Sequence, residues 1–179
     1  MSGAPQAESV EKKIREAEHF LRELRKLNGL AFGDRERFDF NLSAFLSAAR
    51  AIDYRLRHEQ KNDYLTWRKQ WDANNPTHQG LLLFVASDRA KEVHESGSGR
   101  SMEMTEKPIL GGYSDPSGSL EVSGSFLTGG TKSSVFVPRY TYEIDGTEYP
   151  VIEACDLYLK VLTSIAADFS ATRQEQPTQ

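Results

Sequence analysis

The sequence lacks the features that mark secreted and membrane proteins. Its single cysteine, Cys155, has no partner for a disulfide within the chain. No segment approaches the ~20 consecutive apolar residues that span a bilayer, and residues 1–10 contain no apolar stretch typical of a signal peptide. We therefore expect a cytoplasmic protein with no membrane segment. Cys155 lies in an apolar helical pattern and is expected to be a small buried side chain rather than a nucleophile.

Positive charge is also scarce. The chain has 22 lysine and arginine residues against 26 aspartate and glutamate residues, which gives a formal net charge of −4. Proteins that follow a nucleic-acid duplex along their surface are usually more basic, because they neutralise many phosphates. Binding to duplex DNA is therefore not expected, and any contact with nucleic acid must be confined to a small part of the surface.

Common catalytic and cofactor motifs are missing. The sequence has no GxxxxGK[ST] phosphate loop, no GxGxxG after a strand, no HExxH, no cysteine pair and no GxSxG elbow. The glycines at positions 97, 99, 111, 112, 129 and 130 do not open helices, so they do not resemble phosphate cradles. No two of the four histidines are four residues apart: His19, His58, His78 and His94. We therefore expect neither a metal ion nor a cofactor.

What the sequence does contain is helical periodicity. Three long stretches repeat apolar residues at steps of three and four, which predicts amphipathic helices, and a fourth long stretch predicts a helix that is apolar on nearly all sides. A shorter helix around Asp63–Trp71 is expected between the second and the third, with Trp67 and Trp71 packed together. The four longer helices are expected over Glu8–Leu27, over Phe38–Leu56, from Asn75-Pro76 to about Glu95, and from Pro150 onward.

The third helix differs from the others. Asn75 is a favourable N-cap and Pro76 suits the first helical position. The run Leu81–Ala86 makes this helix apolar on nearly all sides, which predicts a central position in the fold. The run Ser96–Gly99 should end it.

Between the third and fourth helices the composition changes to glycine and serine, and short alternating patches predict strands. Asp145-Gly146, between two such patches, is a strong signal for a tight hairpin. We expect a small antiparallel sheet of three or four strands packed on the helices. Its patches are Ser101–Glu106, Leu120–Phe126, Ser133–Val137 and Arg139–Ile144.

Together these elements predict a mainly α fold, an antiparallel four-helix up-and-down bundle with a small antiparallel β elaboration between the third and fourth helices. The bundle would comprise residues 8–97 and 150–169, and the elaboration residues 98–149. Residues 1–7 and 170–179 are expected to be disordered.

One pair of residues in the third helix has the chemistry of RNA cleavage. His94 falls in the last turn, where the helix dipole favours an imidazolium that can donate a proton to a leaving oxygen. Arg89 supplies a planar fork of donors that suits a phosphate. An alternative is purely structural, with Arg89 paired to Glu92 or Glu95 and His94 capping the helix end.

The spacing limits how this pair can act. Residues five apart on a regular helix are separated by about 140° around the axis and ~7.5 Å along it. Arg89 and His94 can meet one phosphate only if Arg89 wraps back, if the helix loosens before His94, or if a second protomer completes the site across a two-fold axis.

Three segments resemble the HEPN superfamily, small four-helix bundles frequent in bacterial toxin–antitoxin and defence systems. They are residues 38–50 of the second helix (FDFNLSAFLSAAR), the tryptophan-containing stretch at 64–71 (YLTWRKQW), and residues 89–95 (RAKEVHE), which close the third helix. The resemblance covers roughly residues 8–97, with the last helix as the fourth of the bundle.

This resemblance implies a metal-independent endoribonuclease that works as a homodimer, with Arg89 and His94 as catalytic residues and an antitoxin protein as a possible partner. Ala90 departs from the polar residue that many active members carry after the arginine. The alternative is therefore an inactive relative that binds RNA or a protein. Arg50 and Arg57 on the second helix are either contacts to RNA phosphates or part of a solvated face.

Two further interpretations stay open. Arg139, Tyr140 and Tyr142 combine a basic residue with aromatics, as single-strand binders do, although strand packing produces the same pattern. A small-molecule pocket between the bundle and the sheet would need the apolar second and third helices to line it.

Overall fold

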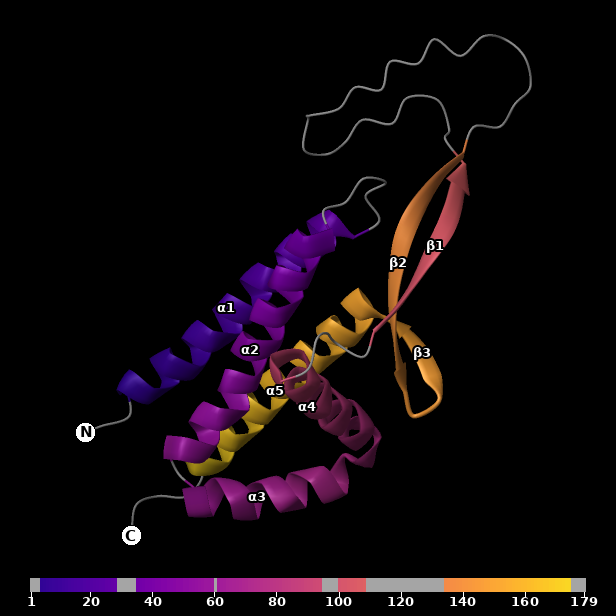
Figure 1. Cartoon of the computed structure of the whole chain (residues 1–179). Coiled ribbons are helices and arrows are strands. Elements are labelled where there is room, and N and C mark those ends of the chain that lie inside the picture. The colour runs from indigo at the N-terminus through magenta and orange to yellow at the C-terminus, as the bar shows by residue number, and fades with distance from the viewer. Residues whose placement is uncertain (1–3, 29–34, 60, 95–99, 109–133, 175–179) are drawn as a thin grey trace, which may run out of the picture.

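The computed structural model describes residues 4–28, 35–59, 61–94, 100–108 and 134–174. It is mainly helical, with a three-stranded antiparallel sheet inserted between the last two helices (Figure 1). The helices are α1 (Ala4–Leu27), α2 (Arg35–Glu59), α3 (Lys61–Asn74), a 3₁₀ turn (Pro76–His78), α4 (Gln79–His94) and α5 (Val151–Gln174); the strands are β1 (Ser101–Pro108), β2 (Ser134–Ile144) and β3 (Thr147–Pro150).

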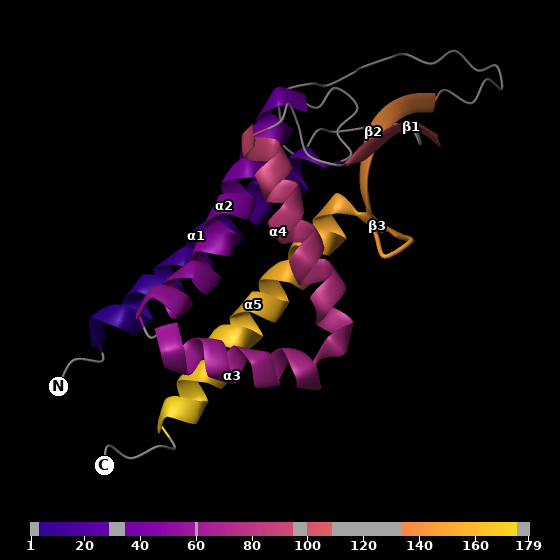
Figure 2. The ribbon, with the colours of Figure 1, turned by 60° about the horizontal axis from the view of Figure 1, so that its bottom comes forward.

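The core lies where α1, α2 and α5 pack together. α1 runs antiparallel to α2 along most of its length, and α5 lies against both (Figures 1 and 2). The apolar stripes predicted for these helices are the buried ones, as expected for helices that each cover one side of a core. The fully buried side chains include Leu24, Phe38, Leu42, Phe45, Ile52, Leu162 and Ile165. Cys155 is buried in α5, as predicted.

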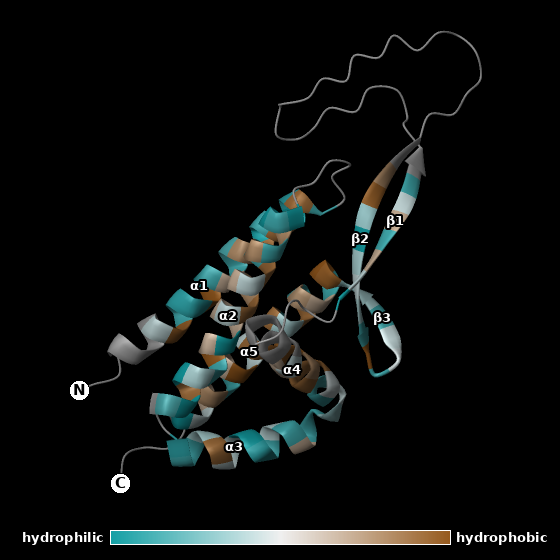
Figure 3. Cartoon of the chain, in the orientation of Figure 1, coloured by the Kyte–Doolittle hydropathy of each residue, from teal (hydrophilic) through white to brown (hydrophobic). Residues whose placement is uncertain are grey.

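α3 crosses the lower end of the other helices, and its mostly hydrophilic surface is visible in Figure 3. Trp67 and Trp71 pack together as predicted, with ring centroids 6.5 Å apart. The indole N–H of Trp71 donates to Asp168 of α5 at 2.9 Å. The ring of Tyr64 meets Phe169 edge to face at 5.1 Å. These contacts fix α3 to the C-terminal part of α5. With this short helix included, the described residues form five α-helices.

Helix α4 begins differently from the prediction. The Asn75 side chain does not cap it. Instead its amide nitrogen donates back to the carbonyl of Trp71 at 2.8 Å, and a 3₁₀ turn separates Asn75 from α4. Nor is α4 central on every side. Leu81 and Val85 are buried, but Leu83 is 71% exposed, because only one face of α4 meets the other elements.

The sheet has the order β1-β2-β3 and carries the predicted hairpin. Asp145 and Gly146 take φ values of 50° and 74°, the left-handed turn expected for Asp-Gly between strands. β2 runs without a break through Pro138, which the sequence placed between two separate patches. At Pro138 only β1 flanks β2, because β3 pairs with residues 141–144, and a proline is tolerated where a strand has a free edge.

The base of the sheet packs on the helices through its aromatic residues. Tyr140 stacks on Phe38 of α2 with ring centroids 4.4 Å apart, and Tyr142 meets Phe84 of α4 at 5.0 Å. Arg139 lies 3.7 Å from Glu148 of the neighbouring strand. The aromatic pattern of β2 therefore reflects packing, and not an exposed platform for bases.

Some predicted boundaries shift. Residues 4–7 and 170–174, predicted to be disordered, are helical. The expected strand at Leu120–Phe126 and the expected break at Ser96–Gly99 lie outside the described residues.

Candidate functional site

The two residues of the Arg-x4-His motif occupy the last two turns of α4. The helix is regular to His94, so it does not loosen before that residue. The side chains of residues 88–94 lie outside the described residues, and the site at Arg89 and His94 stays a prediction. Two ways of bringing both to one phosphate are left: Arg89 wraps back along the helix, or a second protomer completes the site.

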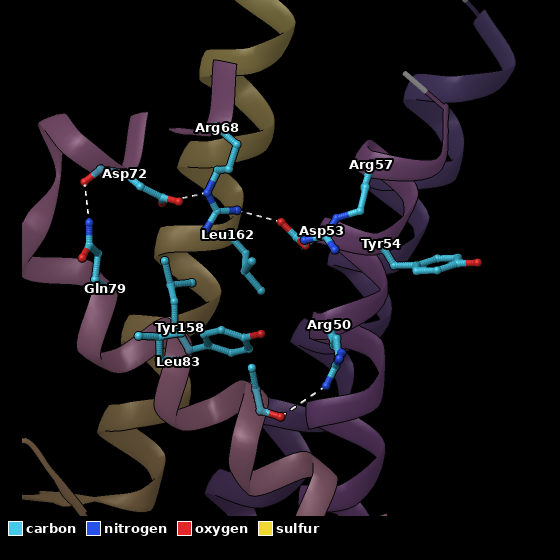
Figure 4. A pocket seen from close by; sticks show the side chains of 12 residues that line it. Arg50, Asp53, Tyr54, Arg57, Arg68, Asp72, Gln79, Leu83, Tyr158 and Leu162 are labelled. Carbon is cyan, nitrogen blue, oxygen red and sulfur yellow. Dashed lines mark hydrogen bonds and ion pairs between the residues drawn. The ribbon is translucent and has the colours of Figure 1, made fainter. Parts of the chain in front are cut away.

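A cavity of about 480 Å³ lies between α2 and α4, with α5 behind it and α3 at one end (Figure 4). We call it the α2–α4 cavity. Both arginines that the sequence offered as phosphate contacts, Arg50 and Arg57, stand on its α2 side. Their spacing of seven residues puts them on one face of the helix, two turns apart. The sequence placed these two residues on the same polar side of the helix, and the structure adds that both line one cavity.

Arg50 connects this cavity to the helix that carries the motif. Its Nη1 donates to the backbone carbonyl of Ala86 at 3.2 Å. Ala86 precedes Arg89 by three residues, just under one helical turn. Among the described residues, Arg50 has one hydrogen bond, to that carbonyl, and no carboxylate partner. A guanidinium carries five N–H donors, so most of its capacity faces solvent and the cavity.

The α3 end of the cavity is closed by a polar network around Arg68. Arg68 Nη1 donates to Asp53 at 2.7 Å and to the Tyr64 hydroxyl at 3.0 Å, while its Nε donates to Asp72 at 2.8 Å. The Tyr64 hydroxyl in turn donates to Asp53 at 2.5 Å. The Arg68 side chain is only 15% exposed. These bonds join α2 to α3 and hold Arg68 as a fixed part of the wall.

The network also shifts two proton equilibria. Burial, and then the Asp53 carboxylate, raise the pKa of the Tyr64 phenol well above its usual range. Burial acts to lower the pKa of the Arg68 guanidinium, but its bonds to Asp72 and Tyr64 outweigh that effect and the pKa is raised. Tyr64 therefore remains protonated and Arg68 remains a cation, which favours a structural role for both.

The back of the cavity is apolar. The buried Tyr158 and Leu162 form it from α5, while Leu82 and the largely exposed Leu83 line the cavity from α4. In Figure 4 the ring of Tyr158 lies across the cavity with its hydroxyl directed toward the Arg50 side, whereas Tyr54 points away. A ligand here would meet hydrocarbon on one side and guanidinium groups on the other.

Charge in the cavity is biased toward the positive. Of the described residues that line it, three are arginines and two are aspartates, an excess of one positive charge. Arg68 is committed to Asp53 and Asp72. Arg57 reaches Asp53 at 3.3 Å, but its side chain is 53% exposed, and such exposed pairs contribute little. Arg50 and Arg57 are therefore the cations available to an anionic ligand.

Sequence reasoning missed Arg68, Asp72 and Tyr158. The spacing of four between Arg68 and Asp72 predicts an ion pair on α3, but it gives no sign that Asp53 joins them from α2. Tyr158 belongs to the apolar stripe of α5, and nothing in that pattern distinguishes a residue that lines a cavity from one that fills the core.

Within the described part of the chain, no cluster of three or more histidine, cysteine, aspartate or glutamate residues has the geometry to hold a metal ion. None of the described helices is long and apolar enough to cross a membrane. The pocket predicted between bundle and sheet is not where the cavity lies, since its described lining comes from helices alone.

Comparisons of the chain with protein-family models, with curated proteins and with solved structures found no match.

Proposed function

We propose that this chain is a HEPN-like endoribonuclease that cleaves RNA without a metal ion, in the manner of a toxin or defence nuclease. In this proposal α1, α2, α4 and α5 correspond to the four bundle helices of that superfamily, and the sheet is an addition. His94 acts as the acid and base, and Arg89 binds the scissile phosphate. The observation that carries the proposal is the contact of Arg50 with the carbonyl of Ala86, which puts a cation at the middle of α4, three residues before Arg89.

The chemistry needs only proton transfers and charge stabilisation. A neutral imidazole removes the proton of a ribose 2′-hydroxyl, whose oxygen attacks the adjacent phosphorus. The bond from phosphorus to the 5′-oxygen breaks, and that oxygen takes a proton from an imidazolium. The products are a 2′,3′-cyclic phosphate and a 5′-hydroxyl. The Arg89 guanidinium stabilises the charge that develops on the phosphoryl oxygens.

A homodimer suits this scheme, since two His94 side chains facing one cleft can divide the roles of base and acid. α2 offers a surface for it. Phe40, Ser47 and Tyr54 recur at steps of seven, and therefore share a face. Phe40 is 65% exposed and Tyr54 is 64% exposed. Large aromatic residues in such a row are typical of protein interfaces. We place the two-fold axis along this face of α2.

Digestion of RNA in the presence of a chelator tests the nuclease. The wild-type protein should cleave and leave 2′,3′-cyclic phosphate ends, while His94→Ala and Arg89→Ala should lose at least about a hundredfold in rate. Arg139→Ala is the matched control, because Arg139 is exposed on β2 and its ion-pair partner is Glu148 of β3. Equal cleavage by all four proteins would contradict the assignment of Arg89 and His94 as the catalytic residues.

The dimer has its own test. Light scattering should give twice the chain mass for the wild type, and Tyr54→Glu should shift it toward the monomer, because a charge on an apolar interface is costly to bury. A wild-type protein that is monomeric at all concentrations would contradict the dimer.

Ala90 favours a second candidate, an inactive relative that binds RNA. It cannot supply the hydrogen bond of the polar residue found after the arginine in many active members. This candidate is distinguished by an electrophoretic shift with RNA in the absence of any cleavage, and by restoration or appearance of cleavage in Ala90→Asn.

A further inference from the structure

We propose that the α2–α4 cavity is a binding site for one nucleotide of a single-stranded RNA, with its phosphate on Arg50 and Arg57 and its base against the apolar back of the cavity. The inference deepens the proposed function, because it takes RNA as the source of the nucleotide. It concerns residues outside the Arg-x4-His motif.

Size and shape support a small ligand. The cavity volume of about 480 Å³ falls within the range of pockets that hold small molecules and cofactors. The cavity opens between two helices and has a back wall from a third, α5 (Figure 4). Leu82 and Leu162 contribute hydrocarbon on which a flat ring can lie. Such contacts are tolerant of base identity, because every base has an apolar face.

The charges favour a phosphate as the anionic part. Arg50 and Arg57 stand two turns apart on α2, and both present guanidinium groups, whose planar forks match phosphate oxygens. Within the described part of the chain, Arg50 has one hydrogen bond, to a neutral carbonyl. Arg57 can leave Asp53 at small cost, because that contact is long and exposed. Asp53 itself keeps two other donors, Arg68 and Tyr64, so the departure of Arg57 leaves no unpaired carboxylate.

Tyr158 adds a polar group to the apolar wall. Its ring is buried in α5, and its hydroxyl is directed toward the Arg50 side of the cavity in Figure 4. Tyr158 already has a contact within the protein, and a phenolic hydroxyl, which both donates and accepts, can add a bond to a ribose or to a base edge. The combination of two guanidinium groups, a hydroxyl and an apolar wall fits a nucleoside monophosphate better than it fits an inorganic anion or an apolar compound.

The position of the cavity relates it to cleavage. Arg50 touches the α4 backbone just under one turn before Arg89. A strand whose scissile phosphate lies at Arg89 would carry a neighbouring nucleotide into the cavity. The site would then hold substrate without taking part in the proton transfers, and its loss should raise KM rather than lower kcat.

The test is calorimetric titration of the full chain, with His94→Ala used wherever RNA is the ligand so that no cleavage occurs. The ligands are a mixture of the four nucleoside monophosphates, uridine, inorganic phosphate and a short single-stranded oligoribonucleotide. We expect the monophosphates to bind more tightly than either uridine or inorganic phosphate, and the oligoribonucleotide to displace them.

Four variants locate the site. Arg50→Gln and Arg57→Gln should each weaken nucleotide binding about tenfold, because each removes a charge-assisted contact. Ala86→Phe should weaken it as much by filling the cavity. Arg55→Gln is the matched control on the same helix, since Arg55 faces α1, where it bonds to Ser9, and it should bind like the wild type.

Three results would overturn the inference: no binding of any monophosphate, equal binding of monophosphate and inorganic phosphate, or Arg50→Gln binding like Arg55→Gln. If the oligoribonucleotide failed to displace the monophosphates, RNA would not be the source of the bound nucleotide. None of these depends on catalysis. A protein that binds nucleotides in the cavity but never cleaves would instead refute the nuclease and leave the cavity site standing.

Discussion

Replacement of Arg68 by methionine should destabilise the fold more than loss of any exposed arginine. Methionine keeps an unbranched, flexible stem and part of the packing beside Trp71, whose ring centre lies 5.6 Å from the guanidinium carbon. It removes the donors to Asp53 and Asp72 at 2.7 and 2.8 Å. The two carboxylates then lose the cation that lies between them, while α2 and α3 lose the connection that it provides.

The magnitude follows from the charge-assisted bonds. Each is worth a net ~1.5–3 kcal/mol when both partners are withdrawn from water. Both carboxylates here keep partial contact with solvent, and Asp53 keeps its bond from Tyr64, so water and Tyr64 recover part of the loss. We therefore expect Arg68→Met to lower the free energy of unfolding by about 2–3 kcal/mol. With a typical urea dependence, the midpoint should fall by about 1 M or more.

Urea unfolding followed by tryptophan fluorescence measures this, because Trp67 and Trp71 lie on the same helix as Arg68. Arg15→Met is the control. Arg15 reaches Glu11 at 3.7 Å on the exposed side of α1, and such a pair contributes less than about 0.5 kcal/mol. A double-mutant cycle with Asp72→Asn should give a coupling of about 1 kcal/mol or more. If Arg68→Met and Arg15→Met unfold at the same urea concentration, the network does not stabilise the fold.

Three other predictions concern stability. The folded chain holds the Tyr64 proton more tightly than the unfolded chain, because the pKa of Tyr64 is raised on folding. The stability that this proton contributes is full below about pH 10 and is lost as pH rises through the raised pKa. Urea unfolding from about pH 8 to 11 should therefore show a steeper fall of the unfolding free energy for the wild type than for Tyr64→Phe. Gly146→Ala should cost about 1 kcal/mol in thermal unfolding, because φ is +74° there and no atom lies within 4 Å of the added carbon, so the cost is conformational. Leu42→Ala should cost about 2–5 kcal/mol, since Leu42 is fully buried, whereas Leu83→Ala on the exposed side of α4 should change stability by less than about 0.5 kcal/mol; equal losses in the two variants would contradict the assignment of the core.

Residue patterns along the chain predict most of the helices and strands and the faces that they bury. The stripes of α1 and α2 and most of that of α5 are buried as their spacing predicts, because a three-to-four-residue repeat has only one apolar side to hide. Asp145-Gly146 determined the hairpin, because the backbone of that turn needs positive φ at both positions. These are local properties, and each depends on residues that are close in the chain.

The same reasoning failed where local signals compete. Asn75 has the chemistry of an N-cap, yet it bonds backward to Trp71, because a 3₁₀ turn comes between it and α4. The run Leu81–Ala86 carries no periodicity, so the sequence contains no sign of which side of α4 is exposed. Leu83 is exposed although it lies within this apolar run. Its exposure depends on which elements surround α4, and not on its neighbours in the chain.

Which charged residues share a site depends on the tertiary structure and cannot be predicted from local patterns. Arg50 and Arg57 were visible as two cations on one helix, but the cavity beside them exists because α4 and α5 meet α2 there. Arg68 and Asp53 are fifteen residues apart and on different helices. Their contact depends on how α3 turns back across α2, a geometry set by the packing of the whole bundle. Periodicity specifies which face of each helix is buried, whereas the partner that each polar face meets is fixed only when the helices are assembled.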